Sequence, residues 1–378
     1  MTRGSIGFDY TAAPGHAPGV GRYVRELVRA LVRIDGIAGA APRPLRLVEF
    51  GRAPRPMDGA PLGLSGADVT RPVHRIRLRL PRRALSAADR LCGLTGTVAS
   101  RGCALFHRAP SEREYRLRAP WSLAVAEFPR AGSQADEELS LTCRVARGII
   151  VFSADAADRI STRYGVDPGR VHQVPVGSEH WERDLGAAHG PRTSRDILVL
   201  GAIRNSRLPL HALTAFEALA GVTKDARLLF VGRPGDATEA FSTALDRSPV
   251  VSRVRWIQDP VEARMPSCVA GASVLLHLTE DEASPVTPLE ALRMGVPVVA
   301  SRIPAFEEAV GDGASFVEQD DAEGTAKALE RALIDSQSSA SRQALREIAA
   351  PFTWRASAEA HLAAWQTMLS SPPLPSAE

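Results

Sequence analysis

Short apolar runs alternate with amphipathic stretches along the whole chain of 378 residues. Apolar runs of roughly four to eight residues are typical of buried strands, and apolar residues three or four apart are typical of helices. In the first half we predict strands at residues 5–10, 45–50, 74–80, 104–107, 122–127 and 148–153. We predict helices between them at residues 20–34, 83–99, 135–146 and 154–164. Strands that alternate with helices indicate an α/β fold with a parallel sheet.

The same alternation starts again in the second half. Residues 184–194 are polar, contain Gly and Pro and show no period, which is typical of a linker. Beyond them we predict strands at residues 196–200, 227–231, 251–257, 273–278 and 296–300. We predict helices at residues 208–220, 238–246, 262–270, 288–294, 322–335 and 352–368. The pattern therefore predicts two doubly wound domains, residues 1–192 and 193–378, which bind ligands beyond the carboxyl ends of their strands.

Composition and cysteine spacing narrow the class of protein. The four cysteines (Cys92, Cys103, Cys143 and Cys268) lie far apart and form no CxxC pair, so we expect neither a zinc site nor a disulfide framework. No stretch approaches the ~18 apolar residues of a membrane-spanning helix, and the first residues lack the apolar core of a signal peptide. We therefore expect a cytoplasmic protein.

Charge is divided unequally between the two halves. Residues 1–192 carry a formal net charge of +10 and residues 193–378 one of −7. A basic domain suits an anionic ligand or an anionic membrane surface. Nucleic acid is a weaker interpretation, because no helix-turn-helix or RNP-like aromatic pattern accompanies the arginines, and we expect no nucleic-acid partner.

An alternating basic segment adds to this picture. Arg75, Arg77 and Arg79 would lie on one face of a strand, and Arg82 and Arg83 follow. This segment is either a half-exposed strand in an arginine-rich protein or a contact with a lipid-phosphate-linked acceptor or the inner membrane leaflet.

Two segments carry candidate binding chemistry. Gly19 and Gly21 open a helix after the first strand, where glycine lets backbone N–H groups approach an anion; a turn that serves only packing is the alternative. Glu282 lies in a loop before a helix that starts near Pro288, and Glu290 lies near the start of that helix. Two such carboxylates can accept hydrogen bonds from sugar hydroxyls, although an acidic loop plus a helix-start Glu would look the same.

Together these segments resemble the retaining glycosyltransferases of family 4, which have the GT-B fold. The resemblance is carried by GVGRYVRELVRAL, by IIVFSADAADRISTRYGVDPGRVHQVPVG, and by the run from Glu282 to Glu290 with the following LEALRMGVPVVAS and RIPAFEEAVGDGASFVEQDD. It implies two Rossmann-like domains facing a central cleft, an N-terminal acceptor domain and a C-terminal donor domain. It also implies that the last helix, residues 352–368, packs back toward the first domain.

The resemblance also implies roles for individual residues. Glu290 would bind the ribose hydroxyls of the nucleotide, and Glu282 the hydroxyls of the transferred sugar. Gly19 and Gly21 would close over the phosphates. The diphosphate and sugar would also face two arginines and the backbone at the helix start, namely Arg204, Arg207, Ser284, Pro285, Val286 and Thr287.

The chain departs from the family pattern at several positions. Ala126 stands where the family has a His near the donor sugar, whereas His107 stands where the His of the preceding strand is expected. Glu127 lies where the family has Asp, and is a candidate base on the acceptor side. Arg207 replaces the usual Lys. The catalytic candidates are therefore Glu282, His107 and Glu127.

The resemblance predicts a retaining, metal-independent hexosyltransferase of polysaccharide or lipopolysaccharide biosynthesis. It would move a sugar from a UDP- or GDP-linked donor to a cell-surface glycan or lipid-linked acceptor, need no cofactor, and contact the inner face of the cytoplasmic membrane peripherally. Two alternatives stay open: a non-catalytic scaffold that binds sugar nucleotides, suggested by Ala126 and the absent Lys, and a sugar-nucleotide epimerase of the same fold.

Overall fold

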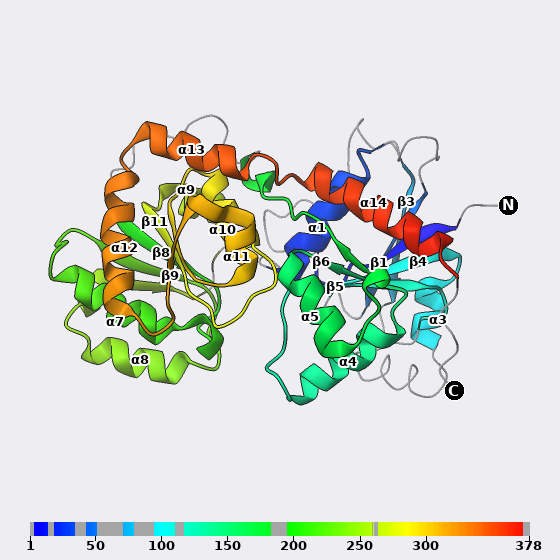
Figure 1. Cartoon of the computed structure of the whole chain (residues 1–378), viewed down its shortest axis with the longest axis horizontal. Coiled ribbons are helices and arrows are strands. Elements are labelled where there is room, and N and C mark those ends of the chain that lie inside the picture. The colour runs from blue at the N-terminus through cyan, green and yellow to red at the C-terminus, as the bar shows by residue number, and fades with distance from the viewer. Residues whose placement is uncertain are drawn as a thin grey trace. The chain divides into compact units, whose positions relative to one another are not determined.

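The computed structural model describes residues 4–13, 19–34, 43–50, 71–78, 94–109, 117–182, 195–258, 260 and 264–372. The chain forms two compact units. Unit 1 consists of Met1–Gly177 and Trp354–Glu378, and unit 2 of Ser178–Thr353 (Figure 1). The predicted linker at residues 184–194, residues 83–93 of one predicted helix, and Cys92 lie outside the described residues.

Unit 1 is built on a parallel sheet of seven strands. Their order across the sheet is β3-β2-β1-β4-β5-β6-β7. The strands are β1 (Ser5–Asp9), β2 (Leu45–Phe50), β3 (Val73–Leu78), β4 (Cys103–Arg108), β5 (Trp121–Val125), β6 (Gly148–Val151) and β7 (Val171–Gln173). The chain order reverses between β1 and β4, which is the switch point at which such sheets bind ligands.

Sequence signals define the helices of unit 1. These helices are α1 (Val20–Leu31), α3 (Leu94–Ser100), α4 (Gln134–Val145), α5 (Ala154–Tyr164) and α14 (Trp354–Ser370). Ser133 and Ser153 cap α4 and α5, each accepting a hydrogen bond from a backbone N–H in the first turn. Gly165 ends α5 in the left-handed conformation, with φ of 65°.

The C-terminal helix α14 packs on unit 1 through an apolar face. Trp365 is buried and meets Phe8 of β1 edge to face, with 5.6 Å between ring centroids. Two glycines make room for this helix. A Cβ on Gly148 would lie 2.5 Å from Met368 Cε, and one on Gly177 would lie 2.4 Å from the backbone N of Trp354.

Unit 2 is built on a second parallel sheet, of six strands in the order β10-β9-β8-β11-β12-β13. The strands are β8 (Asp196–Leu200), β9 (Arg227–Val231), β10 (Val254–Ile257), β11 (Val274–His277), β12 (Val298–Ser301) and β13 (Ala314–Val317). The helices are α7 (Pro209–Ala220), α8 (Thr238–Arg247), α9 (Met265–Gly271), α10 (Val286–Arg293), α11 (Pro304–Val310), α12 (Ala322–Asp335) and α13 (Ser339–Ala349). Its switch point lies between β8 and β11.

The predicted fold class of two Rossmann-like α/β domains is confirmed, and the cleft between them stays a prediction. The expected division after residue 192 differs from the division at Gly177/Ser178. Residues 178–182 belong to unit 2 because Glu182 pairs with Arg293 of α10 there. The sequence pattern did not predict β7, β13, α11 or α13. No helix in the described ranges is both long and apolar enough to cross a membrane.

Candidate functional site

The loop after β8 is held by close backbone contact at the switch point of unit 2. Gly201 follows β8 with φ of 124°, a conformation that favours glycine. A Cβ on Gly232, which follows β9, would lie 1.7 Å from the carbonyl oxygen of Gly201. The two glycines therefore let the loop pass over the neighbouring strand and carry Arg204 and Arg207 along the carboxyl edge of the sheet.

A strained residue joins this loop to helix α7. Leu208 has φ of 47° and ψ of 48° and is the one non-glycine residue with positive φ in the described part of the chain. This left-handed conformation costs a side-chain-bearing residue about 1–2 kcal/mol. Pro209 then starts α7, whose first turn suits the fixed φ of proline. The strain lies directly after Arg207, a candidate functional residue.

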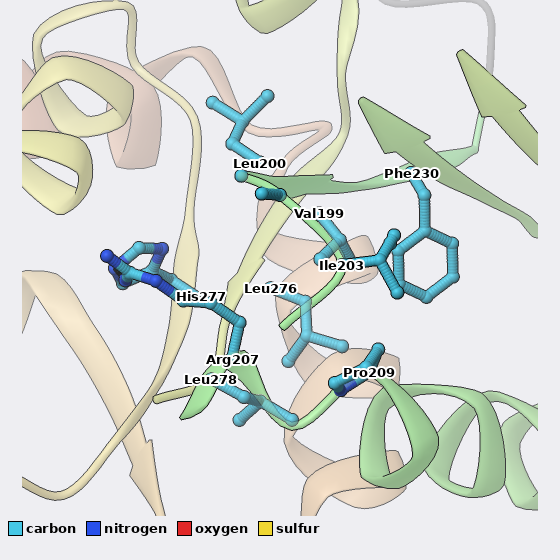
Figure 2. A pocket seen from close by; sticks show the side chains of 11 residues that line it. Val199, Leu200, Ile203, Arg207, Pro209, Phe230, Leu276, His277 and Leu278 are labelled. Carbon is cyan, nitrogen blue, oxygen red and sulfur yellow. Dashed lines mark hydrogen bonds between the residues drawn. The ribbon is translucent and has the colours of Figure 1, made fainter. Parts of the chain in front are cut away.

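Arg207, His277 and Glu282 come together at the carboxyl ends of β8 and β11. His277 Nε2 lies 2.9 Å from Glu282 Oε2 and 3.3 Å from Arg207 Nη1. Arg207 Nη1 also donates to Glu282 Oε2. Figure 2 shows Arg207 and His277 on the same side of the pocket, away from Phe230. The arrangement joins two residues that the sequence singled out and adds His277, which it did not.

Glu282 is held as a carboxylate. It is 5% exposed, and burial favours its neutral form. The positive charge of Arg207 and the contact with His277 outweigh that burial and lower its pKa to about 2. At neutral pH Glu282 can therefore accept hydrogen bonds from hydroxyl groups, and it has no proton to donate.

Arg207 and His277 also line a small pocket (Figure 2). Its volume is about 10 Å³, which is about one water molecule. The lining residues are Val199, Leu200, Gly201, Ala202, Ile203, Arg207, Pro209, Phe230, Leu276, His277 and Leu278. A nucleotide or sugar cannot fit inside it, so a ligand at this edge would lie on its outer side.

Helix α10 presents its start beside the second glutamate. Ser284 and Pro285 are buried before it, and Val286 and Thr287 form its first residues. The first N–H groups of a helix have no partner within the helix, and Pro285 provides no side-chain cap. The predicted backbone segment therefore does open a helix, as an anion-facing element requires.

Glu290, the second glutamate of the predicted donor site, is almost fully buried. It is 1% exposed, on α10, and its Oε1 lies 3.1 Å from Nε2 of His180. His180 belongs to the short 3-10 helix η2 (Glu179–Trp181) and is itself buried. No pattern in the sequence pointed to His180, which follows the last strand of the first half by only a few residues.

The remaining candidates of unit 2 differ in accessibility. Arg204 is exposed at the start of the turn η3 (Asn205–Arg207), whereas Arg207 is partly buried. Only Arg207 of this pair is joined to Glu282 in the described structure. Among the described residues, no three His, Cys, Asp or Glu side chains form a group that could hold a metal ion.

In unit 1 the two glycines stand at the start of α1. Gly19 is the N-cap residue, with φ of 68° and ψ of −128°, and its carbonyl accepts from the N–H of Tyr23. A residue with a Cβ would be strained there, so glycine is required by the backbone. Gly21 is buried within the first turn.

The other unit 1 candidates occupy opposite environments. Glu127 is exposed two residues beyond β5. His107 is 1% exposed on β4, and both of its ring nitrogens contact side chains of the same unit. Burial, with a smaller contribution from His361, lowers the pKa of His107 well below its ordinary value. Its catalytic role stays a prediction, while this geometry favours a structural role.

His107 is part of a buried hydrogen-bond chain that runs from Trp365 to the carbonyl of Ser357. The indole N–H of Trp365 can only donate, here to Ser122 Oγ, and the carbonyl of Ser357 can only accept, here from His361 Nδ1. Burial lowers the pKa of both imidazoles, so both are neutral at neutral pH. With neutral rings, Ser122 donates to His107 Nδ1, His107 Nε2 donates to Tyr23 Oη, and Tyr23 donates to His361 Nε2.

The predicted arginine face is partly neutralised. Arg77 Nε lies 2.9 Å from Glu49 Oε2, and Arg75 also pairs with Glu49 of the neighbouring strand β2. Arg79, Arg82 and Arg83 lie outside the described residues.

Comparison with known proteins finds a family similarity in the second unit. Residues 185–350, within unit 2, match the family model described as glycosyl transferases group 1. The chain is 28% identical over 200 residues to glycogen synthase of Bordetella parapertussis, covering 48% of this chain and 39% of that protein. It is 32% identical over 178 residues to MMP α-(1→4)-mannosyltransferase of Mycolicibacterium hassiacum, covering 44% and 41%.

A solved structure extends the likeness to the whole fold. The α,α-trehalose-phosphate synthase (UDP-forming) of Burkholderia vietnamiensis aligns with a TM-score of 0.67 at 14% identity, covering 98% of this chain and 99% of that one. The aligned parts of the curated relatives are about 40% of their length. Residues 185–350 are thus similar to glycosyl transferases, and the solved structure shows that the chain shares its two-domain fold.

Proposed function

We propose that this protein is a retaining, metal-independent hexosyltransferase of the family 4 type. It takes a sugar from a UDP- or GDP-linked donor and needs no cofactor. The observation that carries the proposal is the group of Arg207, His277 and Glu282 at the switch point of unit 2, within the segment that matches glycosyl transferases group 1. A basic side chain and an ionised carboxylate at this edge suit a ligand that carries both phosphates and hydroxyls.

The charges suit cleavage of a sugar–phosphate bond. Negative charge grows on the leaving diphosphate, and prepositioned guanidinium and backbone N–H groups stabilise it. Arg204, Arg207 and the start of α10 supply such groups. Glu282, as a carboxylate, accepts hydrogen bonds from the sugar hydroxyls while the anomeric carbon becomes oxocarbenium-like. Glu290 orients the ribose.

The donor and acceptor are proposed by class. The name of the trehalose-phosphate synthase states that UDP is formed, which favours a UDP-linked donor, and the mannosyltransferase name favours a hexose. We propose a cell-surface glycan or lipid-linked acceptor and a cytoplasmic protein in peripheral contact with the membrane. Because Arg75 and Arg77 share Glu49, that contact would depend more on Arg79, Arg82 and Arg83 than the sequence alone suggested.

Ligand-induced stabilisation tests the proposal. Nucleotides that bind the folded state raise its melting temperature by mass action. We expect one of UDP, GDP, ADP and dTDP, or its sugar conjugates, to stabilise the protein. Glu290→Gln should raise the dissociation constant of that nucleotide at least tenfold and abolish turnover. The reason is that a carboxylate binds hydroxyl groups more strongly than an amide does.

The matched control is Glu280→Gln, an exposed loop carboxylate that should change neither property. Transfer at the wild-type rate by a folded Glu290→Gln protein would disprove the assignment. Nucleotide binding without transfer to any acceptor would favour the scaffold. Interconversion of free sugar nucleotides without an acceptor would favour the epimerase.

A further inference from the structure

A buried tyrosine hydroxyl lies at the carboxyl edge of the unit 1 sheet. Tyr10 directly follows β1, and its side chain has no exposed surface. Its Oη has no hydrogen-bond partner among the described residues. Leaving such a group unsatisfied is costly, so it calls for an explanation in the native state. The carboxyl end of β1 is also where the switch point of this sheet lies.

Arginines of two elements, α1 and β3, act on Tyr10. Arg25 and Arg29 lie one turn apart on α1 and both pair with Glu26. On β3, Arg75 and Arg77 both pair with Glu49, and Arg75 Cζ lies 6.0 Å from the centroid of the Tyr10 ring. Each carboxylate thus holds two guanidinium groups. The six charged groups together carry a net charge of +2.

The charges act directly on the Tyr10 hydroxyl. Burial raises its pKa, while the positive charges of Arg29, Arg25 and Arg75 lower it and the negative charge of Glu26 adds to the rise. The hydroxyl therefore keeps its proton and remains a hydrogen-bond donor, in a positive field that attracts an anion.

The cluster is more exposed on its β3 side than on its α1 side. The side chains of Arg25, Glu26 and Glu49 are nearly buried, whereas that of Arg75 is 29% exposed and that of Arg77 41%. A ligand would therefore meet Arg77 and Arg75 at the surface, and would have to reach past them to the buried Tyr10 hydroxyl.

We propose that Tyr10, Arg25, Arg29, Arg75 and Arg77 form a binding site for a phosphate ester of the acceptor. This inference rests on the proposed function in naming the bound molecule as acceptor; the phosphate site itself does not depend on transfer. A phosphate dianion matches the surplus of two positive charges. Guanidinium groups bind phosphate through two N–H donors each, and Tyr10 supplies a donor that has no partner among the described residues.

The test is isothermal titration calorimetry, in which the protein is titrated with inorganic phosphate and with glycerol phosphate. Tyr10→Phe should raise the dissociation constant about tenfold or more, because it removes a hydrogen bond to a charged group. The same variant should leave the free protein as stable as wild type or more so, since it removes a hydroxyl without a partner in the described ranges. A purely structural role for Tyr10 would lower stability instead.

Two further variants locate the bound phosphate. Arg29→Gln should weaken binding, while Arg101→Gln, at an exposed arginine before the opposite end of β4, should not. Arg204→Gln removes a candidate phosphate contact of unit 2, and the effect of Tyr10→Phe should persist in that background. Phosphate binding that is lost in Arg204→Gln and unchanged in Tyr10→Phe would overturn the proposal.

Vesicles distinguish the two sources of such a phosphate. Flotation with phosphatidylcholine vesicles, with and without phosphatidylglycerol, measures binding to a lipid headgroup. Binding of soluble phosphate that is sensitive to Tyr10→Phe supports a soluble acceptor, and vesicle binding with the same sensitivity supports a lipid-linked one. Response to neither overturns the site. Because no donor is present, failure of the Glu290→Gln test leaves this result interpretable.

Discussion

At the scale of single residues, the candidate donor site depends on how one buried carboxylate is kept ionised. Glu282 has a pKa of about 2 although it is buried, because Arg207 and His277 both contact its Oε2. Removing one member of such a group leaves the rest uncompensated, which is more damaging than the net stability of the group suggests. His277 is thus a positioning residue that acts through Glu282.

Two substitutions of His277 separate the effect of its hydrogen bond from the effect of changing the side chain. His277→Gln keeps a side-chain hydrogen-bond donor near Glu282, whereas His277→Leu removes it. Because a hydrogen bond to a charged group contributes about 1.5–3 kcal/mol, we expect kcat/KM to fall by roughly ten- to a hundredfold in His277→Leu and much less in His277→Gln. In His277→Leu the acidic limb of the pH profile of kcat/KM should shift to higher pH, because the pKa of Glu282 rises. Equal losses in both variants would contradict the positioning role.

Leu208 offers a second prediction at this scale. Its φ of 47° is unfavourable for leucine and acceptable for glycine. Leu208→Gly should therefore stabilise the protein by about 1 kcal/mol, measured by urea unfolding. Leu210→Gly, at a partly exposed position in helix α7, should destabilise it by about the same amount. Destabilisation by both variants would show that packing of the Leu208 side chain outweighs its backbone strain.

At the scale of elements, the sequence predicted the strands and helices that have a clear apolar pattern. It missed the elements and residues that depend on contacts with other parts of the chain. The strands with continuous apolar runs and the helix carrying Glu290 were predicted because burial on both faces leaves a clear pattern. The four-residue strand β13 is only half-buried, and the polar helix α13 has a single buried residue, Ala349, so neither stood out. His180 and His277 were missed because their partners come from other elements.

The packing of α14 on unit 1 gives a prediction about an element. Gly177→Ala places a Cβ 2.4 Å from the backbone N of Trp354, which cannot move without shifting the helix. Gly148→Ala meets the flexible end of Met368, which can adopt another rotamer. We therefore expect Gly177→Ala to destabilise the protein by about 2 kcal/mol or more, and Gly148→Ala by less. Hydrogen exchange should show increased opening of α14 in Gly177→Ala, and equal protection in the two variants would refute this account.

At the scale of the whole molecule, two sheets with the same switch-point topology are stabilised by different polar interiors. Unit 1 has a chain of neutral groups from Trp365 to Ser357, and unit 2 has an ionised group around Glu282. The restart of the alternation predicted two domains. It could not predict that residues 178–182 join unit 2, because that depends on contacts such as the one between Glu182 and Arg293.

This difference predicts how stability depends on pH. Burial lowers the pKa of His361 from 6.5 to about 4, and His107 is lowered as well. Between pH 6.5 and 4 the unfolded chain therefore binds more protons than unit 1, so the stabilisation is complete above about pH 6.5 and is lost as the pH falls toward 4. For His361 alone the loss approaches about 3 kcal/mol.

Unit 2 should respond less over the same range. Its Glu282 stays ionised down to a pH of about 2, and among its histidines the pKa of His211 is lowered by burial against opposing contributions from Asp321 and Asp320. Calorimetry at pH 7.5 and pH 5 should show a larger drop in melting temperature for unit 1 than for unit 2. His361→Gln, which removes one titrating group and costs some stability at pH 7.5, should flatten the pH dependence of the unit 1 transition. An unchanged slope in that variant would mean that His361 is not the group responsible.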